Sequence, residues 1–135
     1  WNIPPNQSVL QQVLSELRDG GVRSSLFLDP DSEMVDHAQG VAADRIELYT
    51  EDYASHYAGP ERESVFECYR AAAQRADQLG IGINAGHDLD LQNLAKFLQI
   101  PNILEVSIGH ALVVESLQLG VSQVIERYLA IVDAS

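Results

Sequence analysis

Two histidines in this chain each follow a glycine at the end of a short apolar run. His87 ends the segment Asn84-Ala85-Gly86-His87, and His110 ends the segment Ser107-Ile108-Gly109-His110 about 23 residues later. Glycine allows a backbone to approach a ligand closely, and free N–H groups at a helix start bind phosphate. Histidine donates a hydrogen bond or a proton near neutral pH. The repeated Gly-His pair therefore predicts a site that binds and protonates a phosphorylated compound.

Three further polar residues lie close to the same strand ends, and each has two interpretations. Glu47 sits mid-strand among apolar residues, where a carboxylate costs free energy unless it is paired. It is either neutralised by Arg23 or Arg45, or it orients and polarises substrate groups. Asn84 either hydrogen-bonds within the sheet or binds substrate, and Asp88 either caps the next helix or binds substrate. The alternative role of the two histidines is structural, as helix caps.

Chemistry of this kind needs strands that end side by side, and the hydrophobic pattern predicts four of them. Apolar runs bounded by turn residues predict strands at 22–28, 45–49, 81–85 and 103–107. Helical spacing predicts helices at 9–17, 32–39, 52–57, 61–79, 91–98, 111–119 and 121–132. Strands that alternate with helices predict an α/β fold with parallel β-α-β connections.

Within the predicted strands, apolar and polar residues alternate. Ile46 and Leu48 flank Glu47, and Leu104 and Val106 are expected on one face of the fourth strand. A sheet covered by helices on both faces would instead show continuous apolar runs. The pattern therefore favours a barrel wall, whose polar side lines the lumen, over a doubly wound sheet.

Capping and turn residues add local expectations. Ser8 is the expected N-cap of the first helix, and Asp29-Pro30-Asp31 is expected to end a strand and cap the next helix. Tyr49 ends the second predicted strand, and Tyr53 and Tyr57 lie in the long connection after it. They form either a packed loop or a mobile lid over the site.

The length of the chain bounds its architecture. Its 135 residues, 46% of them hydrophobic, suffice for one domain over 1–135 with a real core. A complete eight-stranded barrel typically needs about 250 residues. The chain begins with Trp1, and its first eight residues have loop character. We therefore expect the C-terminal half of a barrel, with the upstream half missing.

Charge and cysteine usage exclude several classes of function. The formal net charge of −12 argues against nucleic-acid binding and against anionic membranes. No apolar run approaches the roughly 18 residues of a membrane span. The only cysteine, Cys68, rules out an internal disulfide and indicates a reducing compartment, so a cytoplasmic location is expected. The dispersed histidines offer no close ligand pair, so no metal site is expected.

Four segments in order resemble the fifth to eighth strands of the pyridoxine 5′-phosphate synthase family. They are the sequences at 21–29 (GVRSSLFLD), 45–50 (RIELYT), 82–89 (GINAGHDL) and 104–111 (LEVSIGHA). The resemblance implies a (β/α)8 TIM barrel with extra helices that forms homo-oligomers. It implies an enzyme that condenses 3-amino-2-oxopropyl phosphate with 1-deoxy-D-xylulose 5-phosphate. The products are pyridoxine 5′-phosphate, phosphate and water, and no metal or organic cofactor takes part.

The resemblance also assigns roles to residues. His87 matches the proton donor, and Glu47 matches a residue that stabilises the transition state. Gly109 and His110 match the binding site for the phosphate of the aminoketone. Asp88 matches a substrate-binding position that is glycine in some members.

The chain departs from the family at several points. Tyr49 replaces a histidine and Glu51 a glycine of some members, which leaves the role of that loop open. The family's first four strands carry an Asn-x-Asp-His segment, a catalytic His and a general-base Glu, and none has a counterpart here. The isolated polypeptide is therefore expected to be nearly inactive. Its exposed strand edges should favour association.

Two other functions remain alternatives. One is a non-catalytic module, derived from such a barrel, that binds phosphorylated sugars or takes part in assembly. The other is a barrel epimerase or aldolase on phosphorylated sugars. An aldolase would need a Schiff-base lysine at a strand end, whereas the only lysine, Lys96, lies within a predicted helix.

Overall fold

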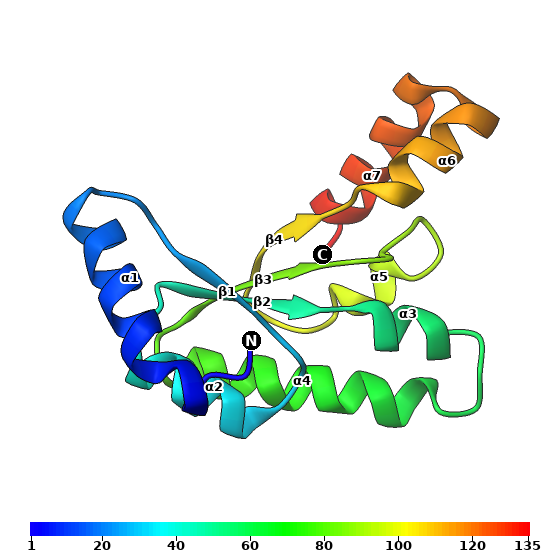
Figure 1. Cartoon of the computed structure of the whole chain (residues 1–135). Coiled ribbons are helices and arrows are strands. Elements are labelled where there is room, and N and C mark those ends of the chain that lie inside the picture. The colour runs from blue at the N-terminus through cyan, green and yellow to red at the C-terminus, as the bar shows by residue number, and fades with distance from the viewer.

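The computed structural model describes residues 1–135 and is built on one four-stranded parallel sheet (Figure 1). Its strands are β1 (Ser25–Leu28), β2 (Arg45–Tyr49), β3 (Gly82–Gly86) and β4 (Ile103–Ser107), and they lie in the order β1-β2-β3-β4. A doubly wound sheet would reverse its strand order at a switch point. The consecutive order is consistent with a partial barrel, and the four strands do not close into one.

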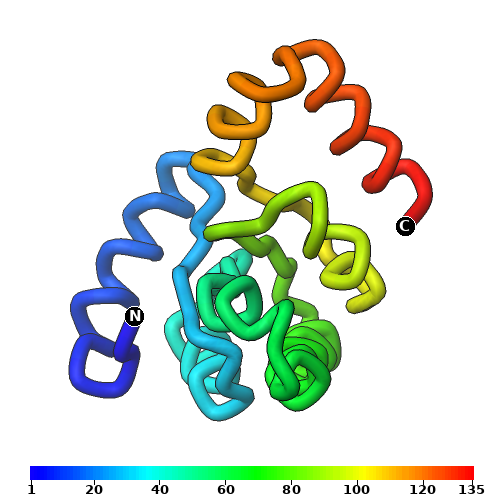
Figure 2. Tube along the Cα trace, turned by 90° about the vertical axis from the view of Figure 1, so that its right-hand side faces the viewer, coloured from blue at the N-terminus to red at the C-terminus, as the bar shows by residue number.

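Helices follow every strand. They are α1 (Gln7–Asp19), α2 (Ser32–Gly40), α3 (Glu51–His56), α4 (Arg62–Gln78), α5 (Leu94–Phe97), α6 (His110–Leu119) and α7 (Val121–Asp133), with a 3-10 turn, η1 (Pro4–Asn6), before α1. Helices α2 and α4 lie along one face of the sheet, whereas α6 and α7 form a hairpin that projects beyond β4 (Figures 1 and 2). Every helix falls short of the length and apolar content that a membrane crossing requires.

The core lies between the apolar strand face and these helices. Register places Leu26 beside Ile46 and Ile46 beside Ile83, and Leu28, Leu48 and Ala85 form the next row. All six side chains are buried. Alternating residues thus define a buried face and a polar face, as the sequence predicts.

The fourth strand departs from simple alternation. Ile103 pairs with Ile83 and Glu105 with Asn84, so a register shift leaves Leu104 without a partner. Leu104 is 59% exposed, whereas Ile103 packs against the core. The expectation that Leu104 shares the buried face of Val106 is therefore wrong.

Three local expectations also change. The first helix begins at Gln7, not after Ser8, because the turn Pro4–Asn6 leads directly into it. Strand β1 begins at Ser25 because Val22 still bonds back to the end of α1, its N–H donating to the Leu17 carbonyl. The expected cap at Asp31 is confirmed, since its side chain accepts from the Glu33 N–H at 2.8 Å.

The predicted helix at 91–98 shortens to Leu94–Phe97. A turn occupies its first residues, because the Asp90 carboxylate accepts from the N–H groups of Gln92 and Asn93. Asp90, and not Asp88, therefore takes the capping role that one interpretation gave to Asp88.

The tyrosines after β2 belong to a packed loop. Tyr53 is fully buried, and its ring lies 5–7 Å from four others, those of Tyr57, Phe66, Tyr69 and Phe97. Its hydroxyl donates to the Asn93 carbonyl at 2.8 Å. This contact joins α3 to the segment before α5, so the structure favours the packed loop over a mobile lid.

Replacing Tyr53 with Phe should lower the free energy of unfolding by about 1 kcal/mol, because one buried hydrogen bond is lost while the ring packing stays. Urea denaturation followed by circular dichroism measures the change. The half-buried Tyr57 provides the matched control, and Tyr57→Phe should have a smaller effect. Equal stability of Tyr53→Phe and the parent chain would contradict this account.

Candidate active site at the carboxyl ends of the strands

The polar face of the sheet carries one continuous row of side chains. Register places Phe27 beside Glu47, Glu47 beside Asn84, and Asn84 beside Glu105. Arg23, which leads into β1, reaches Glu105 on β4 with a nitrogen–oxygen distance of 3.6 Å. In a flat sheet the first and fourth strands would stand about 14 Å apart. The ion pair therefore spans the polar face from its first strand to its fourth.

Arg45 organises the part of this face that lies toward the amino ends of the strands. Its Nη1 donates to Asn84 Oδ1 at 2.9 Å and to Glu105 Oε2 at 3.1 Å. Asn84 is only 5% exposed, so the interpretation of Asn84 as a hydrogen-bonding residue within the sheet is confirmed. Its substrate-binding role stays a prediction.

Glu47 has no cationic partner in this arrangement. Neither Arg23 nor Arg45 forms an ion pair with it, so the interpretation that an arginine neutralises Glu47 is wrong. A Cβ added at Gly86 would lie 2.5 Å from Glu47 Oε1. Glycine at this position therefore makes room for the carboxylate, which lies over the last residue of β3.

Burial of the Glu47 carboxyl raises its pKa, and the nearby Glu105 acts in the same direction. A hydrogen bond from the Ser107 side chain and the nearby His87 oppose the rise. A carboxyl group whose pKa is raised by folding takes up a proton more readily in the folded chain than in the unfolded one.

Glu47→Gln should therefore be more stable than the parent chain at pH 7. A raised folded pKa means that ionisation of Glu47 costs stability as the pH rises from the unfolded value of 4.5 through the folded pKa. Below about pH 4 both states hold the proton, so the difference should vanish. Melting temperatures from pH 3 to 8 measure it, with Glu51→Gln on the exposed start of α3 as the control. A difference that persists at pH 3 would contradict this account.

His87 projects from the carboxyl end of β3. Its ring centroid lies 4.4 Å from that of Tyr49 and 6.3 Å from that of Phe27, and the residue is exposed. His87 and Asp88 both have positive φ angles, of 95° and 55°. Non-glycine residues in such conformations cost of order 1–3 kcal/mol each.

Two hydrogen bonds hold this loop. The Thr50 hydroxyl donates to the His87 carbonyl, and Asn93 Nδ2 donates to the Asp88 carbonyl at 3.0 Å. Thr50 and Asn93 are themselves buried. The surrounding structure therefore holds the strained backbone conformation of the loop that carries His87.

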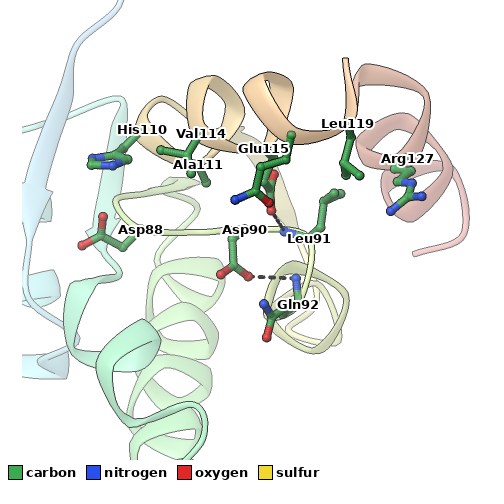
Figure 3. A pocket seen from close by; sticks show the side chains of 11 residues that line it. Asp88, Asp90, Leu91, Gln92, His110, Ala111, Val114, Glu115, Leu119 and Arg127 are labelled. Carbon is green, nitrogen blue, oxygen red and sulfur yellow. Dashed lines mark hydrogen bonds between the residues drawn. The ribbon is translucent and has the colours of Figure 1, made fainter. Parts of the chain in front are cut away.

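Asp88 and His110 border one cavity of about 570 Å³, between the loop after β3 and the α6–α7 hairpin (Figure 3). His110 is the first residue of α6, and Gly109 occupies the N-cap position. The interpretation of His110 as a simple helix cap is therefore wrong. A Cβ at Gly109 would meet nothing within 4 Å, so the space beside it is open.

The structure thus forms two neighbouring groups from the predicted site residues. Glu47 and Asn84 lie on the polar face of β2 and β3, and His87 follows the carboxyl end of β3. Asp88 and His110 instead face the cavity. The basic residue Arg127, from α7, also lines the cavity (Figure 3). No local pattern pointed to Arg127, because the residue joins the cavity lining only through the α6–α7 hairpin.

Glu115 is a second residue that sequence reasoning missed. One of its carboxylate oxygens accepts from the Leu91 N–H at 3.2 Å, and the other accepts from the Tyr128 hydroxyl. Burial and the neighbouring Glu115 raise the pKa of Tyr128, so this phenol stays protonated and donates. Glu115 therefore links the loop after β3 to both helices of the hairpin.

The remaining ionisable candidates lie elsewhere. The Lys96 Nζ donates to Glu63 Oε2 at 2.9 Å, on the helical side of the molecule. The structure contains no cluster of three or more His, Cys, Asp or Glu side chains with the geometry of a metal site.

Comparisons with known proteins extend this description. The family model for the pyridoxal phosphate biosynthesis protein PdxJ matches residues 1–134. A pyridoxine 5′-phosphate synthase of Flavobacterium johnsoniae is 47% identical over 130 residues, which are 96% of this chain and 54% of the relative. Synthases of the same name from Bacteroides fragilis and Albidiferax ferrireducens are 46% and 42% identical over 95% and 96% of this chain. The chain spans about half the length of these relatives.

Proposed function

The chain belongs to the PdxJ family of pyridoxal phosphate biosynthesis proteins, and we propose that it forms the acid and phosphate-binding half of a pyridoxine 5′-phosphate synthase site. The family membership supports a role in vitamin B6 biosynthesis. In the proposed reaction, 3-amino-2-oxopropyl phosphate condenses with 1-deoxy-D-xylulose 5-phosphate. Pyridoxine 5′-phosphate, phosphate and water are formed, in the cytoplasm, by a barrel of which residues 1–135 are the C-terminal half.

One observation carries the proposal: residues with the required chemistry lie on, or directly after, three adjacent parallel strands. Glu47 lies on β2, His87 follows β3, and His110 follows β4. His87, exposed and held by a fixed loop, is placed to donate a proton to a leaving oxygen. Glu47, with no cationic partner, is placed to stabilise positive charge that develops on the substrate amine.

The proposed phosphate-binding site is the start of α6. Gly109 leaves open space beside the first N–H groups of this ten-residue helix, and His110 adds a side-chain donor. The net charge of −12 opposes an anionic ligand, so local donors must provide the affinity. Arg127 supplies a further positive charge at the cavity. The carboxylates of Asp88 and Glu115 border the same cavity and suit the ammonium end of the aminoketone.

A non-catalytic phosphate-sugar module is the second candidate. The observation that favours it is that these residues carry the Gly109–His110 site without a counterpart of the family's general bases. Such a module would keep the Gly109–His110 site and would bind phosphorylated sugars without converting them.

A chimera tests the proposed function. The upstream part of the Flavobacterium johnsoniae relative, fused before Trp1, should restore pyridoxine 5′-phosphate formation to within about tenfold of that relative. Product is measured by fluorescence or mass spectrometry after incubation with the two phosphorylated substrates. A chimera that folds cooperatively and binds phosphate but forms no product would support the module instead.

A further inference from the structure

The loop after β3 exposes two residues between buried neighbours. His87 and Asp88 are exposed, whereas Gly86 before them and Leu89 after them are buried. Thr50, the residue that follows β2, contacts this loop twice. Its backbone N–H donates to the Gly86 carbonyl at 2.9 Å, and its hydroxyl donates to the His87 carbonyl. One residue after the neighbouring strand thus holds both the end of β3 and the residue that carries the proposed acid.

The Thr50 side chain lies out of reach of solvent and ligands. Thr50 is 0% exposed, and it does not line the cavity beside the loop. The one hydrogen bond that its hydroxyl donates goes to the His87 carbonyl. An effect of this hydroxyl on the chemistry of the site must therefore pass through the backbone of His87.

The main chain around Thr50 is itself held firmly. The hydroxyl of the buried Tyr69 donates to the carbonyl of Tyr49, the residue before Thr50, at 2.7 Å. The Thr50 carbonyl accepts from the Ala54 N–H of α3 at 3.0 Å. The Thr50 hydroxyl is therefore a fixed donor, against which the loop after β3 can be held in place.

The loop needs such a donor because its backbone is strained. The φ angles of His87 and Asp88 are 95° and 55°, and conformations of this kind persist only where the surrounding contacts impose them. Asn93 holds the carbonyl of Asp88 and Thr50 holds that of His87. Without the Thr50 hydroxyl, His87 is expected to relax toward the negative φ that a non-glycine residue prefers, and its side chain would turn with it.

We propose that Thr50 is a positioning residue for His87, whose imidazole it keeps beside the Tyr49 ring at the carboxyl end of β3. The two ring centroids lie 4.4 Å apart. The importance of this position for catalysis rests on the proposed function, in which His87 donates a proton. A general acid must lie within hydrogen-bond reach of the oxygen that it protonates, and a misplacement of about 1 Å costs about 10²-fold in rate.

NMR spectra of the purified chain test the position of the ring without any turnover. The Tyr49 ring displaces the signals of the nearby His87 ring protons, which are identified by their absence in His87→Asn. Thr50→Val should move these signals toward those of an unstructured histidine, whereas Thr50→Ser, which keeps the hydroxyl, should not. The signals of His37 on α2 are the internal control and should stay in place.

Steady-state kinetics of the chimera described above test the catalytic consequence. Thr50→Val should lower kcat about 10- to 100-fold and leave KM for both substrates within about twofold, because Thr50 touches neither substrate. Thr50→Ser should recover most of kcat. Thr50→Ala removes the same hydroxyl with a smaller side chain and should behave as Thr50→Val does, so a valine variant that does not fold leaves the test intact.

Two further comparisons separate positioning from a general loss of stability. Tyr53→Phe also removes one buried hydrogen bond, that to the Asn93 carbonyl, but leaves the donor to His87 in place. It should retain kcat. In a chimera that already carries His87→Asn, Thr50→Val should lower kcat no further, because Thr50 acts only through the His87 side chain.

Four results would overturn the proposal. The first is a set of His87 signals that Thr50→Val leaves unchanged. The second is an equal loss of kcat in Thr50→Val and Thr50→Ser, which would assign the effect to packing and not to the hydroxyl. The third is an equal loss in Tyr53→Phe, and the fourth is an equal loss with and without the His87 side chain. A parent chimera without turnover would count against the proposed function alone, since the NMR comparison would still decide the position of the ring.

Discussion

The 135-residue polypeptide on its own is expected to form no pyridoxine 5′-phosphate above background. It carries the proposed acid, His87, and the proposed phosphate site at Gly109–His110, but the resemblance places the general bases upstream of these residues. General acid–base groups contribute about 10²- to 10⁴-fold each, so the loss of two bases takes turnover below detection.

The measurement uses the purified chain with both phosphorylated substrates over several hours, and the full-length Flavobacterium johnsoniae relative is the positive control. Phosphate binding, followed through the histidine ring signals in NMR spectra, should persist and shows that the site is folded. Turnover close to that of the full-length relative would contradict this prediction, because the residues described here would then suffice for catalysis.

His87→Asn in the chimera should lower kcat about 10²- to 10⁴-fold and leave phosphate binding within about twofold. Asparagine tolerates positive φ, so the loop conformation at φ 95° should be retained. The phosphate site belongs to the next strand and should not be affected. The measurements are steady-state kinetics of product formation and direct titration with inorganic phosphate.

His37→Asn is the matched control, because His37 lies on α2, away from the carboxyl ends of the strands. It should retain the kcat of the chimera. If His87→Asn kept full activity, His87 would not be the proton donor and the module would be favoured. If phosphate binding and turnover fell together, the role of His87 would be binding and not proton transfer.

The sequence predicted the sheet well because strand patterns are local. The run at 45–49 needed only the alternation of Ile46 and Leu48 around Glu47, and its bounds agree with β2. The resemblance to the synthase family is confirmed by the family match and by relatives at 42–47% identity. The same local pattern failed at Leu104, because the register shift depends on how β4 pairs with β3.

Features that depend on contacts between residues far apart in the sequence could not be predicted from the local hydrophobic pattern. The helical spacing at 91–98 is real, but the side-chain bonds of Asp90 to the following N–H groups produce a turn over its first half. The environment of Glu47 could not be predicted, because Arg45 contacts Glu105, 60 residues away, and leaves Glu47 without a cation. Arg127 joins the cavity only when the hairpin folds back over the loop.

The Glu115 carboxylate has a mechanical consequence. Helix α6 buries no side chain fully and packs only the partly buried Leu112 against the core. The hairpin therefore depends for much of its attachment on α7, through the buried Val124 and Tyr128, and on this one acid. One oxygen of Glu115 accepts from the Leu91 N–H and the other accepts from the Tyr128 hydroxyl. A tilt of the hairpin therefore also moves the segment around Leu91. Glu115 thereby couples the helix that begins with His110 to the segment that follows the His87 loop.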